Sequence, residues 1–245
     1  MVTGKEKVIF FGNGPLAEYA LAVLERECQV IFCAHRAEDL EKVCELKREF
    51  PEAHGVLASF GVIIREPVLE LFEPEGILNI HPSALPKYRG PSPIESAILA
   101  GDEEFGVSVM KLVPKMDAGP IYVQATLSGL PLDKDTIYRE LATTGAKMVL
   151  MVIRADELRD KKFDDPEEEA NRVGWLKKVD NPEPQDDSKA TYTEKITKAM
   201  GVLHPGTETA DEILRKIAAY AGYPKAKYAL FGQNCTILAA HKLKP

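Results

Sequence analysis

The start of the chain alternates an apolar run, a helical pattern and a second apolar run, and this order strongly limits the fold. Residues 7–11 end in four apolar side chains, which is typical of a parallel strand buried on both faces. Residues 15–27 repeat apolar positions at helical spacing, and residues 29–34 form the second run. We therefore expect a right-handed β-α-β unit and an α/β fold with a mostly parallel sheet.

Later segments continue the alternation of strands and helices. Residues 38–50 indicate an exposed helix, and residues 55–64 indicate a strand that passes through a turn into an apolar loop. Residues 106–113 and 121–127 predict two more strands. Residues 136–158 have the length and periodicity of a long helix that closes the domain.

Composition excludes several classes of protein. The hydrophobic share of 45% and the charged share of 28% are those of an ordinary globular chain, and no apolar run reaches the roughly 18–20 residues of a membrane helix. No secretory pattern follows Met1, so we expect a cytoplasmic protein, and a monomer. The four cysteines form no C-x-x-C pair, which favours free thiols over a metal site.

The chain divides into two parts of unequal size. The polar, proline-bearing segment 181–187 predicts a connector. We therefore predict a catalytic domain over residues 1–178, a linker over residues 179–197 and a small C-terminal module over residues 198–245.

Local signals within the C-terminal module are clear. Thr209, with Glu212 three residues later, is a typical helix N-cap and predicts a helix over residues 209–221. Residues 230–238 resemble a hairpin. Residues 185–245 carry nine Lys and Arg against six Asp and Glu, although the whole chain has a net charge of −7. A mildly basic tail on an acidic body permits contact with a polyanion.

A polar stretch over residues 76–93 is the strongest candidate for a functional site. Asn79 and His81 are two residues apart on a short apolar strand, so their side chains leave the same face. Four of the twelve residues 82–93 are prolines, which fix φ and predict a rigid, shaped loop. A polar pair beside a rigid loop indicates a catalytic or binding site.

Asp117 follows a later predicted strand and is expected to join Asn79 and His81, because the carboxyl ends of parallel strands meet at one edge of a sheet. No serine or cysteine nucleophile is apparent, so the attacking group must belong to the substrate. An Asn amide can stabilise an oxyanion, a His can relay a proton, and a carboxylate can orient the imidazole or accept the amine's proton. This combination favours acyl transfer to an amine. The alternative is that Asn79 and His81 only cap the loop.

Residues 12–17 fit the spacing G-x-G-x-x-A after the first strand, which allows a dinucleotide site. Such a site also needs an acidic residue at the end of the second strand, where Ala34, His35 and Arg36 stand instead. A tight strand-to-helix turn is therefore favoured over binding of NAD or FAD.

Several of these motifs together resemble the 10-formyltetrahydrofolate-dependent formyltransferases. The matching segments are residues 79–94, 101–102, 106–108 and 117–120. The resemblance implies a Rossmann-like N-terminal domain, 10-formyltetrahydrofolate as co-substrate, no metal, and a catalytic trio of Asn79, His81 and Asp117.

The same resemblance implies two sets of residues that bind the folate. One set is the loop formed by Ser83, Ala84, Leu85 and Pro86, in which Ala84 stands where the family has a leucine. The other set would line the pterin pocket, and its members are Phe60, Gly61, Ile63 and Ile64.

The sequence specifies the molecule that accepts the formyl group less strongly than it specifies formyl transfer itself. Within the family, the nearest resemblance is to enzymes that formylate the α-amine of initiator methionyl-tRNA, and it implies an OB-like C-terminal module that is shortened here. Two alternatives stay open: a formyltransferase acting on an amino sugar nucleotide or another small amine, and a formyltetrahydrofolate hydrolase or folate-binding protein. Residues 35–41 are on balance acidic where the tRNA enzymes have a basic loop, whereas the mildly basic tail favours tRNA.

Overall fold

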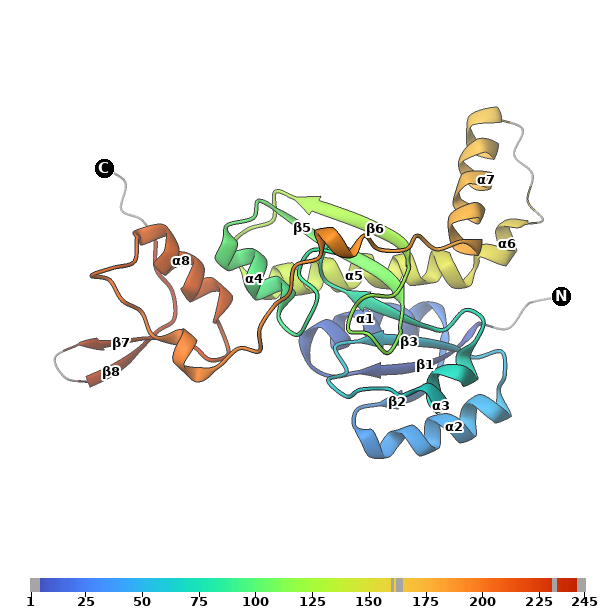
Figure 1. Ribbon diagram of the computed structural model, residues 1–245, viewed down its shortest axis with the longest axis horizontal. Helices are drawn as coiled ribbons and strands as arrows, with labels where there is room; N and C mark the ends of the chain where they lie inside the picture. The colour runs from blue at the N-terminus through green and yellow to red at the C-terminus, as the bar shows by residue number, and fades with distance from the viewer. Residues whose placement is uncertain (1–4, 160, 162–164, 231–232, 242–245) are drawn as a thin grey trace.

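A six-stranded sheet forms the centre of the molecule (Figure 1). The computed structural model describes residues 5–159, 161, 165–230 and 233–241. The strands lie in the order β2-β1-β3-β4-β5-β6. The first four are parallel to one another, β5 is antiparallel to β4, and β6 is antiparallel to β5. Their bounds are β1 (Lys7–Gly12), β2 (Gln29–Ala34), β3 (His54–Ala58), β4 (Ile77–His81), β5 (Glu104–Lys111) and β6 (Ile121–Ser128). The predicted α/β fold with a mostly parallel sheet is confirmed.

Helices cover both faces of this sheet. One layer contains α1 (Gly14–Glu27) and α5 (Lys134–Ile153), and the other contains α2 (Leu40–Glu49) and the short α3 (Glu66–Leu69). The two layers explain why the first strand is wholly apolar, because a strand covered on both faces has no side facing water.

Alternate side chains of β1 separate the two cores. Val8 and Phe10 belong to the cluster beneath α1 and α5, whereas Ile9 and Phe11 belong to the cluster beneath α2 and α3. All four are at most 1% exposed. Burial of each such side chain contributes on the order of 1.5–3 kcal/mol, so β1 anchors both layers.

The helices that follow β6 differ from the sequence expectation. The helix expected over residues 136–158 starts earlier, because the side chain of Asp133 accepts a hydrogen bond from the backbone N–H of Thr136 and caps α5. It is also divided at Arg154, after which a separate helix α6 (Ala155–Arg159) begins. Helix α7 (Pro166–Asp180) was not expected, because residues 167–169 are consecutive glutamates and no apolar stripe marks the segment. None of the helices described is long and apolar enough to cross a bilayer.

After α7 the chain returns along the sheet to the C-terminal module at the opposite end of the molecule (Figure 1). The module contains α8 (Ala210–Ala219) and the hairpin of β7 (Ala226–Leu230) and β8 (Gln233–Ile237). The capping box of Thr209 and Glu212 forms as predicted. The predicted hairpin is present, but it begins at Ala226, and residues 231–232 lie outside the described residues.

Two apolar contacts hold the C-terminal module. Leu203, Ile217 and Ala226 form a small cluster of their own, while Ala219 and Tyr220 join the large core beneath α5. Helix α8 thereby packs against α4 (Pro93–Ala100) of the catalytic region. In the described part of the chain, the C-terminal sheet has two strands, and the shortened OB-like module stays a prediction.

Close packing between α5 and β4 gives a first test. An added Cβ at Gly145 of α5 would lie 2.4 Å from Cγ2 of Ile80, whereas an added Cβ at the exposed Gly174 of α7 would meet nothing within 4 Å. Gly145→Ala should lower the free energy of unfolding by about 1–3 kcal/mol through overpacking. Gly174→Ala should raise it by about 0.5–1 kcal/mol through helix propensity. Urea denaturation measures both, and stabilisation by both variants would contradict the packing seen here.

Candidate active site

The carboxyl ends of β1, β3 and β4 meet at one edge of the sheet, next to the point where the strand order reverses. From β1 the chain first goes out to β2 and then crosses back to β3 on the other side. Open α/β sheets hold their ligands in the crevice at such a switch point.

Strand β4 divides its side chains between the core and this crevice. Leu78 and Ile80 pack into the core beneath α5. Asn79 and His81 point to the other face, and each is 5% exposed. The period-two prediction for this pair therefore holds in the structure.

Asp117 lies beside His81, but for a different reason from the one expected. Strand β5 is antiparallel to β4, so its last residue, Lys111, lies beside Leu78 and not at the carboxyl end of β4. The connection to β6 then folds back over the crevice and brings Asp117 to His81. Gly119 permits this return, because a Cβ there would lie 1.8 Å from the carbonyl oxygen of Lys111.

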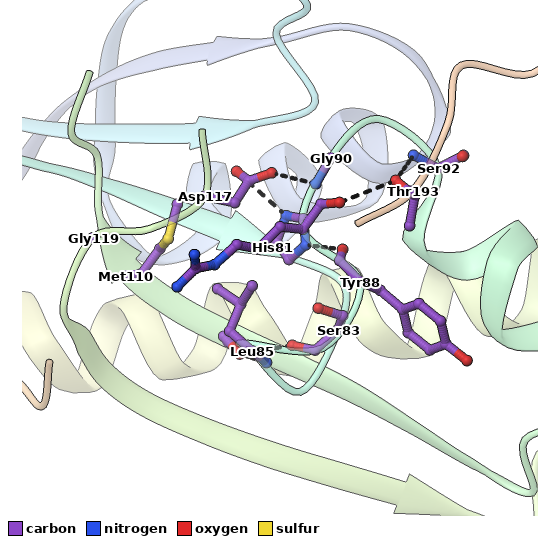
Figure 2. A network of polar contacts seen from close by, with 12 residues as sticks. His81, Ser83, Leu85, Tyr88, Gly90, Ser92, Met110, Asp117, Gly119 and Thr193 are labelled. Carbon is purple, nitrogen blue, oxygen red and sulfur yellow. Dashed lines mark hydrogen bonds and ion pairs between the residues drawn. The ribbon is translucent and has the colours of Figure 1, made fainter. Parts of the chain in front are cut away.

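The polar contacts define how the His81 ring is used (Figure 2). His81 Nε2 lies 3.0 Å from the carbonyl oxygen of Tyr88, which can only accept, so Nε2 carries a proton. Nδ1 lies 3.7 Å from Asp117 Oδ1, an ion-pair distance and not a hydrogen bond. The other carboxylate oxygen, Oδ2, accepts a 2.7 Å hydrogen bond from the backbone N–H of Gly90. The carboxylate is thus held between a main-chain donor and the imidazole.

A cavity of about 420 Å³ opens in front of these three side chains. Its apolar wall comes from the loop after β3 and from the loop after β5, and Asn79, His81 and Asp117 stand together among its lining residues. All four residues predicted for the pterin pocket line it: Phe60, Gly61, Ile63 and Ile64. Ile63 and Met116, which are 79% and 60% exposed, are lining residues that also reach solvent. An apolar-walled cavity with converging polar groups suits a flat, largely apolar ligand.

The predicted folate loop has a different environment. Pro82 lines the cavity, but Ser83, Ala84, Leu85 and Pro86 are not among its lining residues, and Ser83 and Ala84 face a separate hollow of about 350 Å³. Leu85 is only 4% exposed. The structure therefore does not bring this loop into the same cavity as Asn79, His81 and Asp117.

A buried serine holds the loop in this position. Ser108 of β5, which is fully buried, donates to the Ser83 carbonyl at 2.6 Å and accepts from the Leu85 backbone N–H at 3.2 Å. An added Cβ at Gly106 would lie 2.1 Å from the Ala84 nitrogen, so the loop also requires a glycine on β5.

Tyr138 of α5 also lines the cavity, although no sequence pattern indicated it. Its hydroxyl donates to Glu95 Oε1 at 3.0 Å, and Lys134 Nζ lies 3.5 Å from the same oxygen. Burial raises the pKa of Tyr138, with Glu95 adding to the effect, so the phenol stays protonated at neutral pH. Helical periodicity places Tyr138 one turn from Lys134 but cannot indicate which cavity that face meets.

The glycine turn after β1 is accounted for by packing. A Cβ at Gly12 would lie 2.4 Å from the carbonyl oxygen of Ala58, and Gly14 has a φ of +76°. His35, at the end of β2, contacts the Gly12 carbonyl through Nδ1 at 2.8 Å. These contacts agree with the prediction of a tight strand-to-helix turn.

The cysteines and acidic residues that the structure describes form no evident metal centre. All four cysteines are free thiols, and burial raises the pKa of Cys28 to about 11. Among the residues that the structure describes, no group of three or more His, Cys, Asp or Glu side chains could hold a metal ion.

The family model described as formyl transferase matches residues 8–153. The chain belongs to the formyl transferase family. It is 37% identical over 204 residues to a methionyl-tRNA formyltransferase of Roseiflexus sp., covering 82% of this chain and 56% of the relative. This formyl transferase chain thus spans a little over half the length of the curated relatives it matches.

Solved structures show the same fold for this formyl transferase. HypX from Aquifex aeolicus, in complex with tetrahydrofolic acid, superposes with a TM-score of 0.71 at 19% identity, covering 95% of this chain and 37% of HypX. A methionyl-tRNA formyltransferase from Clostridium thermocellum gives a TM-score of 0.65 at 16% identity, covering 98% of this chain and 94% of that one.

The contacts of Ser108 give a second test. Ser108→Ala removes the acceptor of the Leu85 N–H and the donor to the Ser83 carbonyl. An unsatisfied buried group costs about 1–3 kcal/mol, so the free energy of unfolding should fall by that amount. The control is Ser128→Ala at the exposed end of β6, which should change it by less than about 0.5 kcal/mol. Chemical denaturation with equal effects for the two variants would show that Ser108 does not hold the loop.

Proposed function

We propose that this protein transfers the formyl group of 10-formyltetrahydrofolate to the α-amine of methionyl-tRNA. The observation that supports it most directly is the convergence of Asn79, His81 and Asp117 on one apolar-walled cavity in a chain of the formyl transferase family. The relative from Roseiflexus sp. bears the name methionyl-tRNA formyltransferase, which favours this acceptor over the alternatives.

The proposed reaction exchanges the C–N bond between the formyl group and the folate for a C–N bond to the acceptor. The amine nitrogen of the acceptor attacks the formyl carbon, a new C–N bond forms, and the bond from that carbon to the folate nitrogen breaks. One proton leaves the amine and one proton reaches the folate nitrogen, so no net proton is gained or lost.

The three polar side chains would divide the work between them. The Asn79 amide and a protonated His81 donate to the oxyanion that develops on the formyl oxygen. Asp117 stabilises the His81 cation and, with a water molecule, takes the proton of the attacking amine. The hydrogen bond from the Gly90 N–H would keep the Asp117 carboxylate oriented for both tasks.

The apolar wall would hold the folate. Phe60, Gly61, Ile63 and Ile64 line the cavity and would pack against the faces of the flat pterin ring. The loop of residues 83–86 stays a predicted contact, for the part of the donor that extends out of this cavity. HypX, a protein of the same fold, has been solved with tetrahydrofolic acid, which supports a folate here.

The C-terminal module would help to hold the acceptor. We propose a catalytic domain over residues 1–178, a linker over residues 179–197 and an OB-like module over residues 198–245. The basic balance of the tail supports contact with the tRNA backbone. A cytoplasmic location and a monomeric state stay predictions.

Substitution of each polar side chain tests the chemistry. Asn79→Ala, His81→Ala and Asp117→Ala should each lower kcat by about 100-fold or more, because each removes charge stabilisation or proton transfer in the transition state. Asn181→Ala, at the exposed end of α7, is the control and should leave kcat unchanged. Rates near wild type in all three site variants would overturn the proposal.

A comparison of acceptors tests which substrate receives the formyl group. The protein is incubated with 10-formyltetrahydrofolate and, separately, initiator methionyl-tRNA, a panel of amino sugar nucleotides, or buffer alone. We expect a formylated product with methionyl-tRNA and little release of formate without an acceptor. Transfer only to a sugar would contradict the proposed acceptor, and release of formate alone would show a hydrolase.

A further inference from the structure

Arg89 lies in the proline-rich loop of residues 82–92 between β4 and α4, the motif loop. It is the largest side chain that the structure buries completely. Its guanidinium has no access to water and needs acceptors within the protein. The acceptors come from the linker. Nε and Nη2 donate to Gln185 Oε1 at 3.0 and 2.7 Å, and Nη1 donates to Asp187 Oδ1 at 2.8 Å.

Gln185 extends the network to residues 115–119, the part of the β5–β6 connection that carries Asp117 (the catalytic loop). Its Nε2 donates to the carbonyl oxygens of Asp117 at 2.8 Å and Gly119 at 2.7 Å. The orientation of the amide is determined, because a guanidinium can only donate and a backbone carbonyl can only accept. One side chain therefore joins the buried cation to the backbone of the catalytic aspartate.

Asp187 makes a second connection in parallel. Its carboxylate pairs with Lys115 of the same catalytic loop as well as with Arg89. The hydrogen bonds from Lys115 and Arg89 lower the pKa of Asp187, so the carboxylate stays ionised at neutral pH. The loop is thus tied to the linker before and after Asp117.

The linker also supports the other side of the Asp117 carboxylate. Arg89 N–H donates to the Thr191 carbonyl at 2.8 Å, and Thr193 N–H donates to the Arg89 carbonyl at 2.7 Å. Gly90, the next residue, provides the N–H that binds Asp117 Oδ2. Figure 2 shows Thr193 next to the segment that carries Gly90, with Asp117 beyond it.

Asp117 needs such support because its φ of +48° lies in the left-handed region, which residues other than glycine rarely adopt. Strained conformations of this kind persist when the surroundings determine them. The hydrogen bond to the Asp117 carbonyl comes from Gln185, and the hydrogen bond to its carboxylate comes from a residue that the linker holds.

We propose that Gln185 is a positioning residue for catalysis, which sets the distance between Asp117 and His81 through the backbone of the 115–119 loop. This inference rests on the proposed function. It assigns residues 185–193 to the active-site machinery, whereas a connector between domains would need only its chain length.

A linker that is merely docked would not need this amide. The backbone pairs of Ile121 with Glu183 and of Arg89 with Tyr192 already attach the linker to the catalytic region. Gln185 adds contacts aimed at the loop that bears Asp117, so its loss should disturb the geometry of Asp117 and leave the linker attached.

Two substitutions separate positioning from folding. Gln185→Glu keeps an acceptor for Arg89 but removes the donor to the Asp117 and Gly119 carbonyls, and Gln185→Ala removes both functions. Glu183→Gln is the matched control, because Glu183 contributes backbone groups to its bridge with Ile121. The full chain is used throughout, and thermal denaturation monitors folding.

We expect Gln185→Glu to lower kcat about tenfold or more, because a small displacement of a catalytic group slows the reaction strongly. The KM for 10-formyltetrahydrofolate should change by less than about threefold. The acid limb of the pH profile of kcat/KM should shift, since Asp117 and His81 then interact differently. Exchange of the Gly90 amide, measured by NMR, should be faster than in wild type. Glu183→Gln should match wild type in all three.

The inference is overturned if Gln185→Glu retains the wild-type kcat, pH profile and Gly90 exchange. If Gln185→Ala does not fold, Gln185→Glu decides the question. Absence of formyl transfer by the wild-type protein to every acceptor would refute the proposed function, and the Gly90 exchange rate would still decide whether Gln185 positions the loop.

Discussion

The buried guanidinium of Arg89 is the constraint on which the rest of this structure depends. A cation removed from water is tolerated only if its donors find acceptors, and here those acceptors are Gln185, Asp187 and Tyr192, 96 to 103 residues later in the chain. The chain between these partners includes β5, β6, α5 and α7, so the network joins segments that are far apart in the sequence. Burial of one side chain thereby couples the motif loop, the catalytic loop and the linker.

The proposed active site combines this network with a strand that has two different faces. β4 packs Leu78 and Ile80 into the core, so Asn79 and His81 have only the crevice to enter. Asp117 arrives from a loop, and its position is set by hydrogen bonds to main-chain groups on both sides. Asn79 and His81 thus come from a strand, and Asp117 comes from a loop that the linker contacts.

Much of the fold and part of the site were predictable from local patterns. The apolar run of β1, the helix of α1 and the capping box at Thr209 are short-range signals, and each appears where it was expected. Asp117 was expected next to His81 on the assumption of a parallel strand, whereas β5 is antiparallel and the loop turns back. Strand direction depends on pairing partners, which periodicity does not report. Tyr138 and Gln185 were missed because their contacts join segments distant in the chain.

The sequence by itself determined the α/β class, the same-face pair of Asn79 and His81, and the family resemblance, because each rests on residues close together in the chain. Only the tertiary structure decided which cavity those side chains enter, that Ser83 and Ala84 face another hollow, and that the linker contacts the loop that bears Asp117. These features arise from packing and hydrogen bonds between distant segments. Their partners are chosen by the burial of whole layers and by the need to satisfy buried polar groups, neither of which a local pattern can report.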